Sequence, residues 1–370
     1  MKIIADENIA EVKQAFASLG DVHLKAGRTI NAVDVENADI LLVRSVTPVN
    51  AALLKNSKVR FVASATIGTD HVDLDYLAAQ GIGFAHAPGC NANAVAEYVL
   101  SALCHVLQSS EIQKTTIGII GNGNVGSRLA EKLNILGWQY KLNDPFLAAQ
   151  DNNAQYVSLD EIIETCDVIS LHVPLTHAGL YPTQHLFNAA RINKLKSKTV
   201  LINTARGAVI DNEALNIRLQ KHNDLRVVLD VWEHEPHIAA ELLSKVKLAT
   251  PHIAGYSVEG KLRGTEQIYH AAWQYCMAST SLPPAWYKPV AVINKQIALP
   301  NNTPAALCAA YHALYDIAKD DEAMRTQPLT ATRFDELRKH YTLRNEAPTL
   351  QLLSHVPQLE IDFAALGFAV

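Results

Sequence analysis

The feature that most constrains this chain is a glycine pattern at residues 121–126, Gly121-Asn122-Gly123-Asn124-Val125-Gly126. The run before it, 116–120, is β-rich, and after it Val125, Leu129 and Leu133 recur at helical spacing. In such a strand–turn–helix unit the glycines permit a tight turn, a close approach of a pyrophosphate and close helix packing, and the helix N-terminus favours phosphate. The pattern predicts a dinucleotide site with contacts from Gly121, Gly123, Asn124, Val125 and Gly126.

An acidic residue follows the next predicted strand. Asp144 lies 18 positions after Gly126, just beyond the run 138–142. A carboxylate there would accept hydrogen bonds from the ribose hydroxyls of NAD and would repel the 2′-phosphate of NADP. No Lys or Arg immediately follows Asp144, so we expect NAD. An ordinary tight turn is the alternative for the glycines, but strand, helix and acid together favour the cofactor.

Short apolar runs alternate with amphipathic segments in two parts of the chain. The predicted strands are residues 3–5, 40–43, 59–63 and 81–85 in the first part, and 116–120, 138–142, 168–173, 199–203 and 227–231 in the second. This alternation predicts parallel α/β sheets, whose ligands lie at the carboxyl ends of the strands. Ser45 and Thr66 fall at such ends and could line a pocket, although both could equally be turn residues.

Other segments suggest how the parts are joined. Residues 93–107 carry an apolar stripe at helical spacing and could connect two domains. The pattern breaks near Pro283, Pro284 and Pro289, which indicates a boundary. Beyond it, helical patterns at 306–317 and 332–340 mix with apolar runs.

Three polar residues follow apolar runs in the second part. Arg206 lies in INTARGAVID, Glu235 in LDVWEHEP and His252 in TPHIAG. Alcohol oxidation needs a base, for which His is suited near neutral pH, a carboxylate that orients the ring, and a guanidinium that grips a substrate carboxylate. Each residue alone could be structural. Together, downstream of a dinucleotide fingerprint, they predict a catalytic set.

These stretches, with GIIGNGNVGSRLA, resemble the D-2-hydroxy acid dehydrogenase family over roughly residues 40–260. The resemblance implies that Arg206 orients the substrate, Glu235 is the partner acid and His252 is the acid/base. It implies substrate contacts from Ser45, Thr66 and Tyr256, and NAD contacts from Asp144, Val173, Asp230 and Gly255. The segment after Pro174, THAGLYPTQHLFN, is only loosely similar to the family.

Within the family, the chain most resembles a branch that works in pyridoxal 5′-phosphate biosynthesis. That branch oxidises 4-phospho-D-erythronate to 2-oxo-3-hydroxy-4-phosphobutanoate. The resemblance is carried by the stretches IADENI, LLVRSVTPVN, PGCNANAVAEYV and PHIAGYSVEGK. The strand pattern alone would divide the chain linearly. The resemblance instead implies a Rossmann-like NAD domain, 93–256, inserted in a flavodoxin-like α/β substrate domain, 1–92 and 257–286. It also implies a small C-terminal α+β dimerisation domain, 287–370, and hence a homodimer.

Composition argues against other classes of protein and partner. The formal net charge is -5 without a dense run of Lys and Arg, which disfavours a nucleic-acid partner. The five cysteines are widely spaced without CxxC, so we expect no disulfide framework and no metal site. No apolar run approaches the roughly 18 residues that span a membrane, and the N-terminus shows no signal-peptide pattern. We therefore expect a cytoplasmic protein with no membrane partner.

Two alternatives stay open. The chain could oxidise another D-2-hydroxy acid, such as 3-phosphoglycerate, since either substrate is small and phosphorylated. It could also be an NAD-binding scaffold without turnover, which the complete set of Arg206, Glu235 and His252 argues against.

Overall fold

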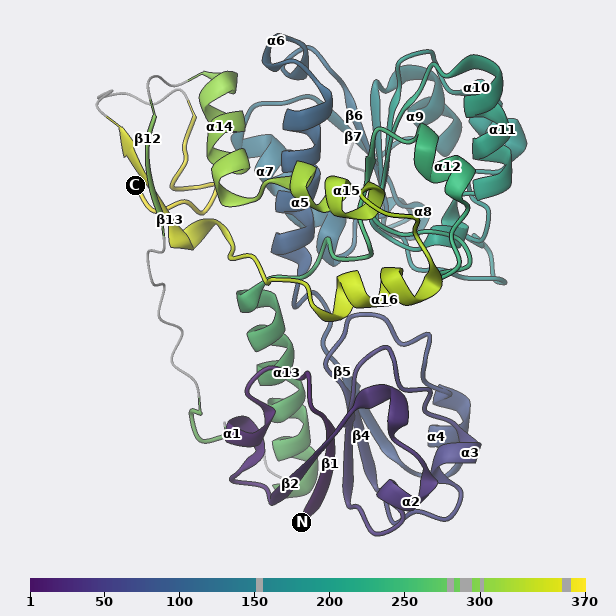
Figure 1. Ribbon diagram of the computed structural model, residues 1–370, viewed down its shortest axis with the longest axis vertical. Coiled ribbons are helices and arrows are strands. Elements are labelled where there is room, and N and C mark those ends of the chain that lie inside the picture. Colours follow the sequence, from purple (N-terminus) through teal and green to yellow (C-terminus); the bar gives the residue numbers. More distant parts are fainter. Residues whose placement is uncertain (151–155, 278–282, 287–294, 300–302, 355–360) are drawn as a thin grey trace. The chain divides into compact units, whose positions relative to one another are not determined.

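The computed structural model describes residues 1–150, 156–277, 283–286, 295–299, 303–354 and 361–370 (Figure 1). Contacts divide the chain into two compact units. The first unit comprises residues 1–91 and 257–290, and the second comprises 92–256 and 291–370.

The first unit is built on a five-stranded parallel sheet. Its order is β2-β1-β3-β4-β5, in which β1 pairs with both β2 and β3. This is the flavodoxin-like order, whose ligand position is the point between the first and third strands where the order reverses. The strands are β1 (Lys2–Asp6), β2 (Asp21–Lys25), β3 (Ile40–Val43), β4 (Phe61–Ser64) and β5 (Gly83–His86).

Side chains of this sheet alternate between two separate cores, as the period of a strand requires. Ile40 and Leu42 belong to one buried cluster, whereas Leu41 and Val43 belong to the other. The helices of the unit are α1 (Val12–Phe16), α2 (Ala32–Val35), α3 (Ala51–Leu54), α4 (Leu74–Ala79) and α13 (Val258–Met277), with a 3-10 turn at Gly27–Thr29.

The second unit carries a six-stranded sheet of order β11-β10-β9-β8-β6-β7. Its strands, all parallel, are β6 (Ile117–Ile120), β7 (Tyr140–Asn143), β8 (Val168–Leu171), β9 (Val200–Asn203), β10 (Arg226–Leu229) and β11 (Leu248–Ala249). A parallel bridge joins Leu142 of β7 to Tyr156. This bridge puts residue 156 in the third-strand position of the 3-2-1-4-5-6 Rossmann order. The carboxyl ends of all these strands lie at one edge.

Helices complete the second unit. Those before residue 257 are α5 (Ala92–Val106), α6 (Ser109–Ile112), α7 (Asn124–Ile135), α8 (Pro145–Ala148), α9 (Leu159–Thr165), α10 (Ala189–Lys194), α11 (Asn212–His222) and α12 (Ala240–Lys245), with a 3-10 turn at Gly207–Val209. The C-terminal segment supplies α14 (Pro304–Leu314), α15 (Ile317–Arg325), α16 (Ala331–Lys339), a 3-10 turn at Ala347–Thr349, and the parallel pair β12 (Lys295–Leu299) and β13 (Leu350–Ser354).

Helix α5 is buried along almost its whole length. Thirteen of its fifteen residues are buried, which is expected of a helix packed in the middle of a core. It contacts α7 within the NAD-type fold and also α14 and α15 of the C-terminal segment. Figure 1 shows α15 drawn across α5 and α14 drawn beside it, within the second unit. The C-terminal segment therefore shares one hydrophobic core with the dinucleotide-type fold.

The predicted α/β fold is confirmed, and the predicted strands match observed strands with small shifts at their ends. The helix predicted at 93–107 is α5. Strand β2 was not predicted, because it lies at the sheet edge with most of its residues exposed and carries no apolar run. No helix among the described residues has the length and apolar character needed to span a membrane.

Candidate active site

The glycine loop between β6 and α7 is shaped for close approach of a ligand. Gly121 has a φ of +87°, which a side chain rarely tolerates. A Cβ on Gly126 would lie 1.9 Å from the carbonyl oxygen of Gly121, so only glycine permits this packing. Around Gly123 a Cβ would meet nothing within 4 Å, and no side chain caps the first turn of α7, where Asn124 and Val125 lie. The loop therefore offers open backbone N–H groups that suit a pyrophosphate.

Asp144 is joined to this loop. Its Oδ2 accepts a hydrogen bond of 3.0 Å from the backbone N–H of Asn122, and its Oδ1 accepts one of 3.2 Å from Leu147 at the start of α8. The Asn122 amide donates to the Tyr156 hydroxyl at 2.7 Å, while its buried Oδ1 has no partner among the described residues. An acid fixed beside the loop and an unsatisfied acceptor both fit a bound dinucleotide with free ribose hydroxyls.

Val173 and Gly255 lie at this same edge of the sheet. Val173 follows β8, and its Cγ1 would lie 2.9 Å from a Cβ on Gly121, so the side chain abuts the glycine loop. Gly255 follows β11 and His252 and is partly exposed. The predicted cofactor contacts of both residues stay predictions.

His252 and Glu235 form a pair. The ring Nδ1 lies 2.8 Å from Glu235 Oε2, and Glu235 Oε1 accepts a hydrogen bond of 2.7 Å from the backbone N–H of Trp232. Burial alone would raise the pKa of Glu235, but the charge of His252 and these hydrogen bonds outweigh it and hold that pKa below its usual value. Glu235 is therefore a carboxylate at neutral pH, and the Nε2 of His252 remains for a substrate.

The backbone of His252 is held in an unusual conformation. Its φ of +59° is left-handed, which costs a non-glycine residue about 1–3 kcal/mol. Asp230, wholly buried after β10, holds this loop: its carbonyl accepts from the His252 N–H at 2.7 Å. Its carboxylate accepts from Thr250 Oγ1 at 2.6 Å, Ile253 N at 2.8 Å and Ala254 N at 2.9 Å. Its predicted role as an NAD contact stays a prediction.

Arg206 follows β9, next to the strand that precedes Glu235. Its Nη1 donates to the carbonyl of Ala205 at 2.8 Å, and its own carbonyl accepts from the Asn203 amide at 2.9 Å. A Cβ on Gly207 would lie 2.0 Å from the carbonyl carbon of Trp232, so the two loops touch backbone to backbone. The loops that carry Arg206 and Glu235 are therefore in direct contact.

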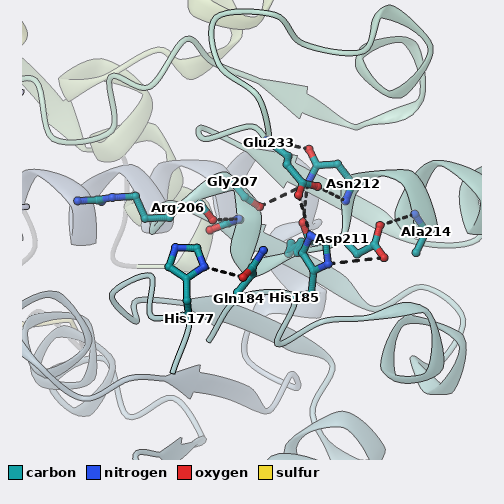
Figure 2. A network of polar contacts seen from close by, with 11 residues as sticks. His177, Gln184, His185, Arg206, Gly207, Asp211, Asn212, Ala214 and Glu233 are labelled. Carbon is teal, nitrogen blue, oxygen red and sulfur yellow. Dashed lines mark hydrogen bonds and ion pairs between the residues drawn. The ribbon is translucent and has the colours of Figure 1, made fainter. Parts of the chain in front are cut away.

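A polar network braces these loops (Figure 2). His185 Nε2 lies 2.7 Å from Glu233 Oε1, Glu233 Oε2 accepts from Asn212 N at 3.1 Å, and Asn212 Oδ1 accepts from Glu233 N at 3.2 Å. Figure 2 shows the Arg206 side chain extending away from this network. His185 belongs to the segment that departs from the family pattern, so that segment helps position the Arg206 loop. Sequence reasoning did not predict this contribution.

The C-terminal segment reaches the loop after His252. The buried Arg344 guanidinium donates to the carbonyls of Ala94 and Ile253, each at 3.1 Å, and also to the carbonyl of Ala254. Its carbon lies 4.3 Å from the centre of the Tyr315 ring. One arginine from the last part of the chain thus fixes the backbone that carries the predicted catalytic histidine. No local signal in the sequence marks Arg344 for this role.

Tyr256 lies where this segment meets the loop. Its ring packs edge-on against Tyr341 at 5.9 Å. Burial alone would lower the pKa of Arg338 of α16, but electrostatic interactions with Tyr256 and Glu235 raise it. The site edge therefore includes a cation that was not predicted.

Ser45 and Thr66 lie in the first unit. Ser45 is exposed just beyond β3. The Thr66 hydroxyl, just beyond β4, lies 2.7 Å from Ser64 Oγ and 3.1 Å from the carbonyl of Gly68. Both occupy the carboxyl edge of their sheet, as predicted from the strand pattern. Their contacts with substrate stay predictions.

Among the described residues, no group of three or more His, Cys, Asp or Glu side chains is arranged to hold a metal ion.

Comparison with known proteins gives a family. Residues 96–254 match the NAD binding domain of the D-isomer specific 2-hydroxyacid dehydrogenases, and residues 283–367 match a domain of unknown function. An erythronate-4-phosphate dehydrogenase of Chromohalobacter salexigens is 47% identical over 358 residues, which cover 95% of this chain and 94% of that protein. One of Shewanella halifaxensis is 43% identical and covers 100% of this chain and 99% of that protein.

Solved structures share the fold. A 3-phosphoglycerate dehydrogenase of Entamoeba histolytica with bound NAD+ aligns with a TM-score of 0.64 at 25% identity, covering 77% of this chain and 98% of that one. A D-lactate dehydrogenase of Aquifex aeolicus with NAD and lactic acid aligns with a TM-score of 0.62 at 23% identity, covering 75% and 96%.

Proposed function

The chain belongs to the erythronate-4-phosphate dehydrogenases, a branch of the D-isomer specific 2-hydroxyacid dehydrogenase family, and on this premise we propose that it oxidises 4-phospho-D-erythronate with NAD. The product is 2-oxo-3-hydroxy-4-phosphobutanoate, and the pathway is pyridoxal 5′-phosphate biosynthesis. The observation that carries the proposal is the His252–Glu235 pair at the sheet edge that also bears the glycine loop. The relatives that match over nearly the whole chain favour this substrate over 3-phosphoglycerate, and the His252–Glu235 pair argues against a scaffold without turnover.

His252 is the base in this proposal. With Nδ1–H donating to Glu235, the Nε2 lone pair can accept the proton of the C2 hydroxyl. Glu235 stabilises the imidazolium that results, because its lowered pKa keeps it ionised. NAD, when bound, supplies the acceptor for the hydride that leaves C2.

Arg206 orients the substrate. A guanidinium can hold the C1 carboxylate in a two-point contact and polarise the carbonyl that forms at C2. The braced loops of Arg206 and Glu235 support this role, because catalysis requires the two groups to keep a fixed separation. Ser45, Thr66 and Tyr256 are proposed as further substrate contacts.

The NAD site is proposed at the glycine loop. Gly121, Gly123, Asn124, Val125 and Gly126 would surround the pyrophosphate. The remaining contacts would come from Asp144 with the ribose and from Val173, Asp230 and Gly255 with the rest of the cofactor.

We further propose three functional domains, a homodimer and a cytoplasmic location. Residues 1–92 with 257–286 would bind substrate, 93–256 would bind NAD, and 287–370 would mediate dimerisation. Free thiols at all five cysteines support a reducing compartment. Light scattering tests the dimer.

A turnover assay tests the function. Purified protein is mixed with NAD and 4-phospho-D-erythronate, and NADH absorbance is followed, with a 2-oxo acid added in a parallel sample to reoxidise bound cofactor. Reduction with this acid and little with 3-phosphoglycerate is expected. His252→Ala should abolish it, whereas His237→Ala, an exposed histidine of the same region, should not. Reduction only with other hydroxy acids refutes the substrate, and none with any acid despite NADH binding refutes the enzyme.

A further inference from the structure

The carboxyl end of β4 carries a short chain of hydrogen bonds that includes Thr66. Ser64 is the last residue of β4 and is completely buried. Its Oγ lies 2.7 Å from the Thr66 hydroxyl and 3.0 Å from His71 Nε2. The Thr66 hydroxyl also lies 3.1 Å from the carbonyl oxygen of Gly68. These groups therefore form one connected chain within the first unit.

The backbone that carries this chain is tied to its surroundings. The carbonyl of Thr66 accepts a hydrogen bond from the N–H of Ala87, just beyond β5, at 3.1 Å. The carbonyl of His71 accepts one from the N–H of Val49 at 2.8 Å. Both side chains therefore start from fixed points, and their hydrogen-bond roles follow from a count of donors and acceptors.

The direction of each hydrogen bond is set by the protons that the groups carry. A serine or threonine hydroxyl has one proton, and a carbonyl oxygen can only accept. Thr66 must therefore donate to Gly68, so it accepts in its hydrogen bond with Ser64. The proton of Ser64 is then used on Thr66, and His71 Nε2 must donate to Ser64. The chain of donors runs from His71 through Ser64 and Thr66 to Gly68.

The capacity that Thr66 has left is that of an acceptor. Its proton is committed to Gly68, and one of its two lone pairs is committed to Ser64. Thr66 is partly exposed at the carboxyl edge of the sheet, where folds of this kind bind ligands. A ligand group that contacts its hydroxyl must therefore donate a hydrogen bond. A hydroxyl can do so, whereas a carboxylate or a fully ionised phosphate cannot.

We propose that Thr66 accepts a hydrogen bond from the C3 hydroxyl of the substrate and so selects a hydroxy acid with a second hydroxyl group. The inference rests on the proposed function, in which Thr66 contacts 4-phospho-D-erythronate. That acid has hydroxyls at C2 and C3, and the C2 proton passes to His252 in the proposed reaction. The C3 hydroxyl is then the donor that remains for Thr66. In 3-phosphoglycerate the C3 oxygen carries the phosphate, so Thr66 disfavours that acid.

Kinetics with a substrate that lacks the C3 hydroxyl test the inference. At about pH 8, where the phosphate is doubly ionised, kcat/KM is measured for 4-phospho-D-erythronate and for D-2-hydroxy-4-phosphobutanoate. The parent should prefer the first acid roughly 10- to 100-fold, because loss of the hydroxyl leaves the Thr66 acceptor unpaired in the complex. Thr66→Val keeps the shape of the side chain without its acceptor and should abolish this preference. Thr66→Ser keeps the hydroxyl and should retain most of it.

Thr69→Val is the matched control, because Thr69 lies in the same loop and holds it through its backbone carbonyl, which accepts from the N–H of Val72 at 2.9 Å. This variant should keep the parental preference, and thermal unfolding checks that each variant is folded. A parent that oxidises both acids equally well refutes the role of Thr66 without any variant. A folded Thr66→Val that retains the parental preference refutes it as well. If the parent fails to oxidise 4-phospho-D-erythronate at all, the proposed function fails instead.

Discussion

The buried carboxylate of Asp230 gives a sharp test of how the His252 loop is held. In Asp230→Asn, the oxygen that faces Thr250 and Ile253 can keep its two hydrogen bonds. The new NH2 group faces the N–H of Ala254, so that bond is lost and a buried donor is left unpaired.

The expected cost follows from those three bonds. An unpaired buried N–H costs about 1–3 kcal/mol, and each remaining bond loses its charge-assisted part, about 1 kcal/mol. Burying a neutral amide in place of a carboxylate offsets part of this, so we expect unfolding free energy to fall by about 2–4 kcal/mol. The left-handed backbone at His252 should relax with the loop, which would lower kcat as well.

Urea unfolding followed by circular dichroism measures the first effect, and steady-state turnover measures the second. Asp160→Asn, an exposed acid of the same unit, is the control and should change neither. A loss below about 1 kcal/mol would contradict the hydrogen-bond argument. A destabilised Asp230→Asn with parental kcat would show that the His252 conformation does not depend on these bonds.

Three further predictions follow from the geometry. Glu235→Gln should lower kcat about 10- to 100-fold, because it removes a charge-assisted hydrogen bond to the imidazolium of about 1.5–3 kcal/mol. Unchanged turnover would remove Glu235 from the mechanism. Gly126→Ala should weaken NADH binding, measured by fluorescence titration, and lower the free energy of unfolding by about 1–3 kcal/mol, because the new Cβ meets the carbonyl oxygen of Gly121. Parental values of both quantities would refute this packing. Arg344→Lys should lower the free energy of unfolding by about 2–4 kcal/mol in urea titrations and reduce kcat, because one ammonium cannot reach all the carbonyls that the guanidinium contacts. A parental kcat would show that catalysis does not depend on this contact of the C-terminal segment.

Much of the fold was predictable because its signals are local. Alternating apolar runs and amphipathic segments predicted the parallel sheets, and the glycine spacing predicted the turn between β6 and α7. The pairing of His252 with Glu235 was also within reach, since both follow strands that end at one sheet edge. Residue type and strand position together were sufficient for that pair.

Other parts of the site depend on contacts between distant segments. The hydrogen bonds of the Asp230 carboxylate require the parallel pairing of β10 with β11, which no periodicity reports. Arg344 lies 90 positions beyond Ala254, whose carbonyl it contacts, and nothing around it distinguishes it from a surface arginine. The helical pattern of residues 93–107 likewise predicted a helix, but gave no information on what covers each of its faces.

That covered helix restricts how two copies of the chain can associate. The side of α5 that packs on α14 and α15 is closed by the chain itself, through buried residues such as Leu307 and Tyr311. Two solved structures of the same fold align over 96% and 98% of their own length but over only 75% and 77% of this chain, so this chain carries residues that have no counterpart in them. A partner subunit cannot pack on the side of α5 that α14 and α15 cover. Any dimer of this chain must therefore form through other surfaces.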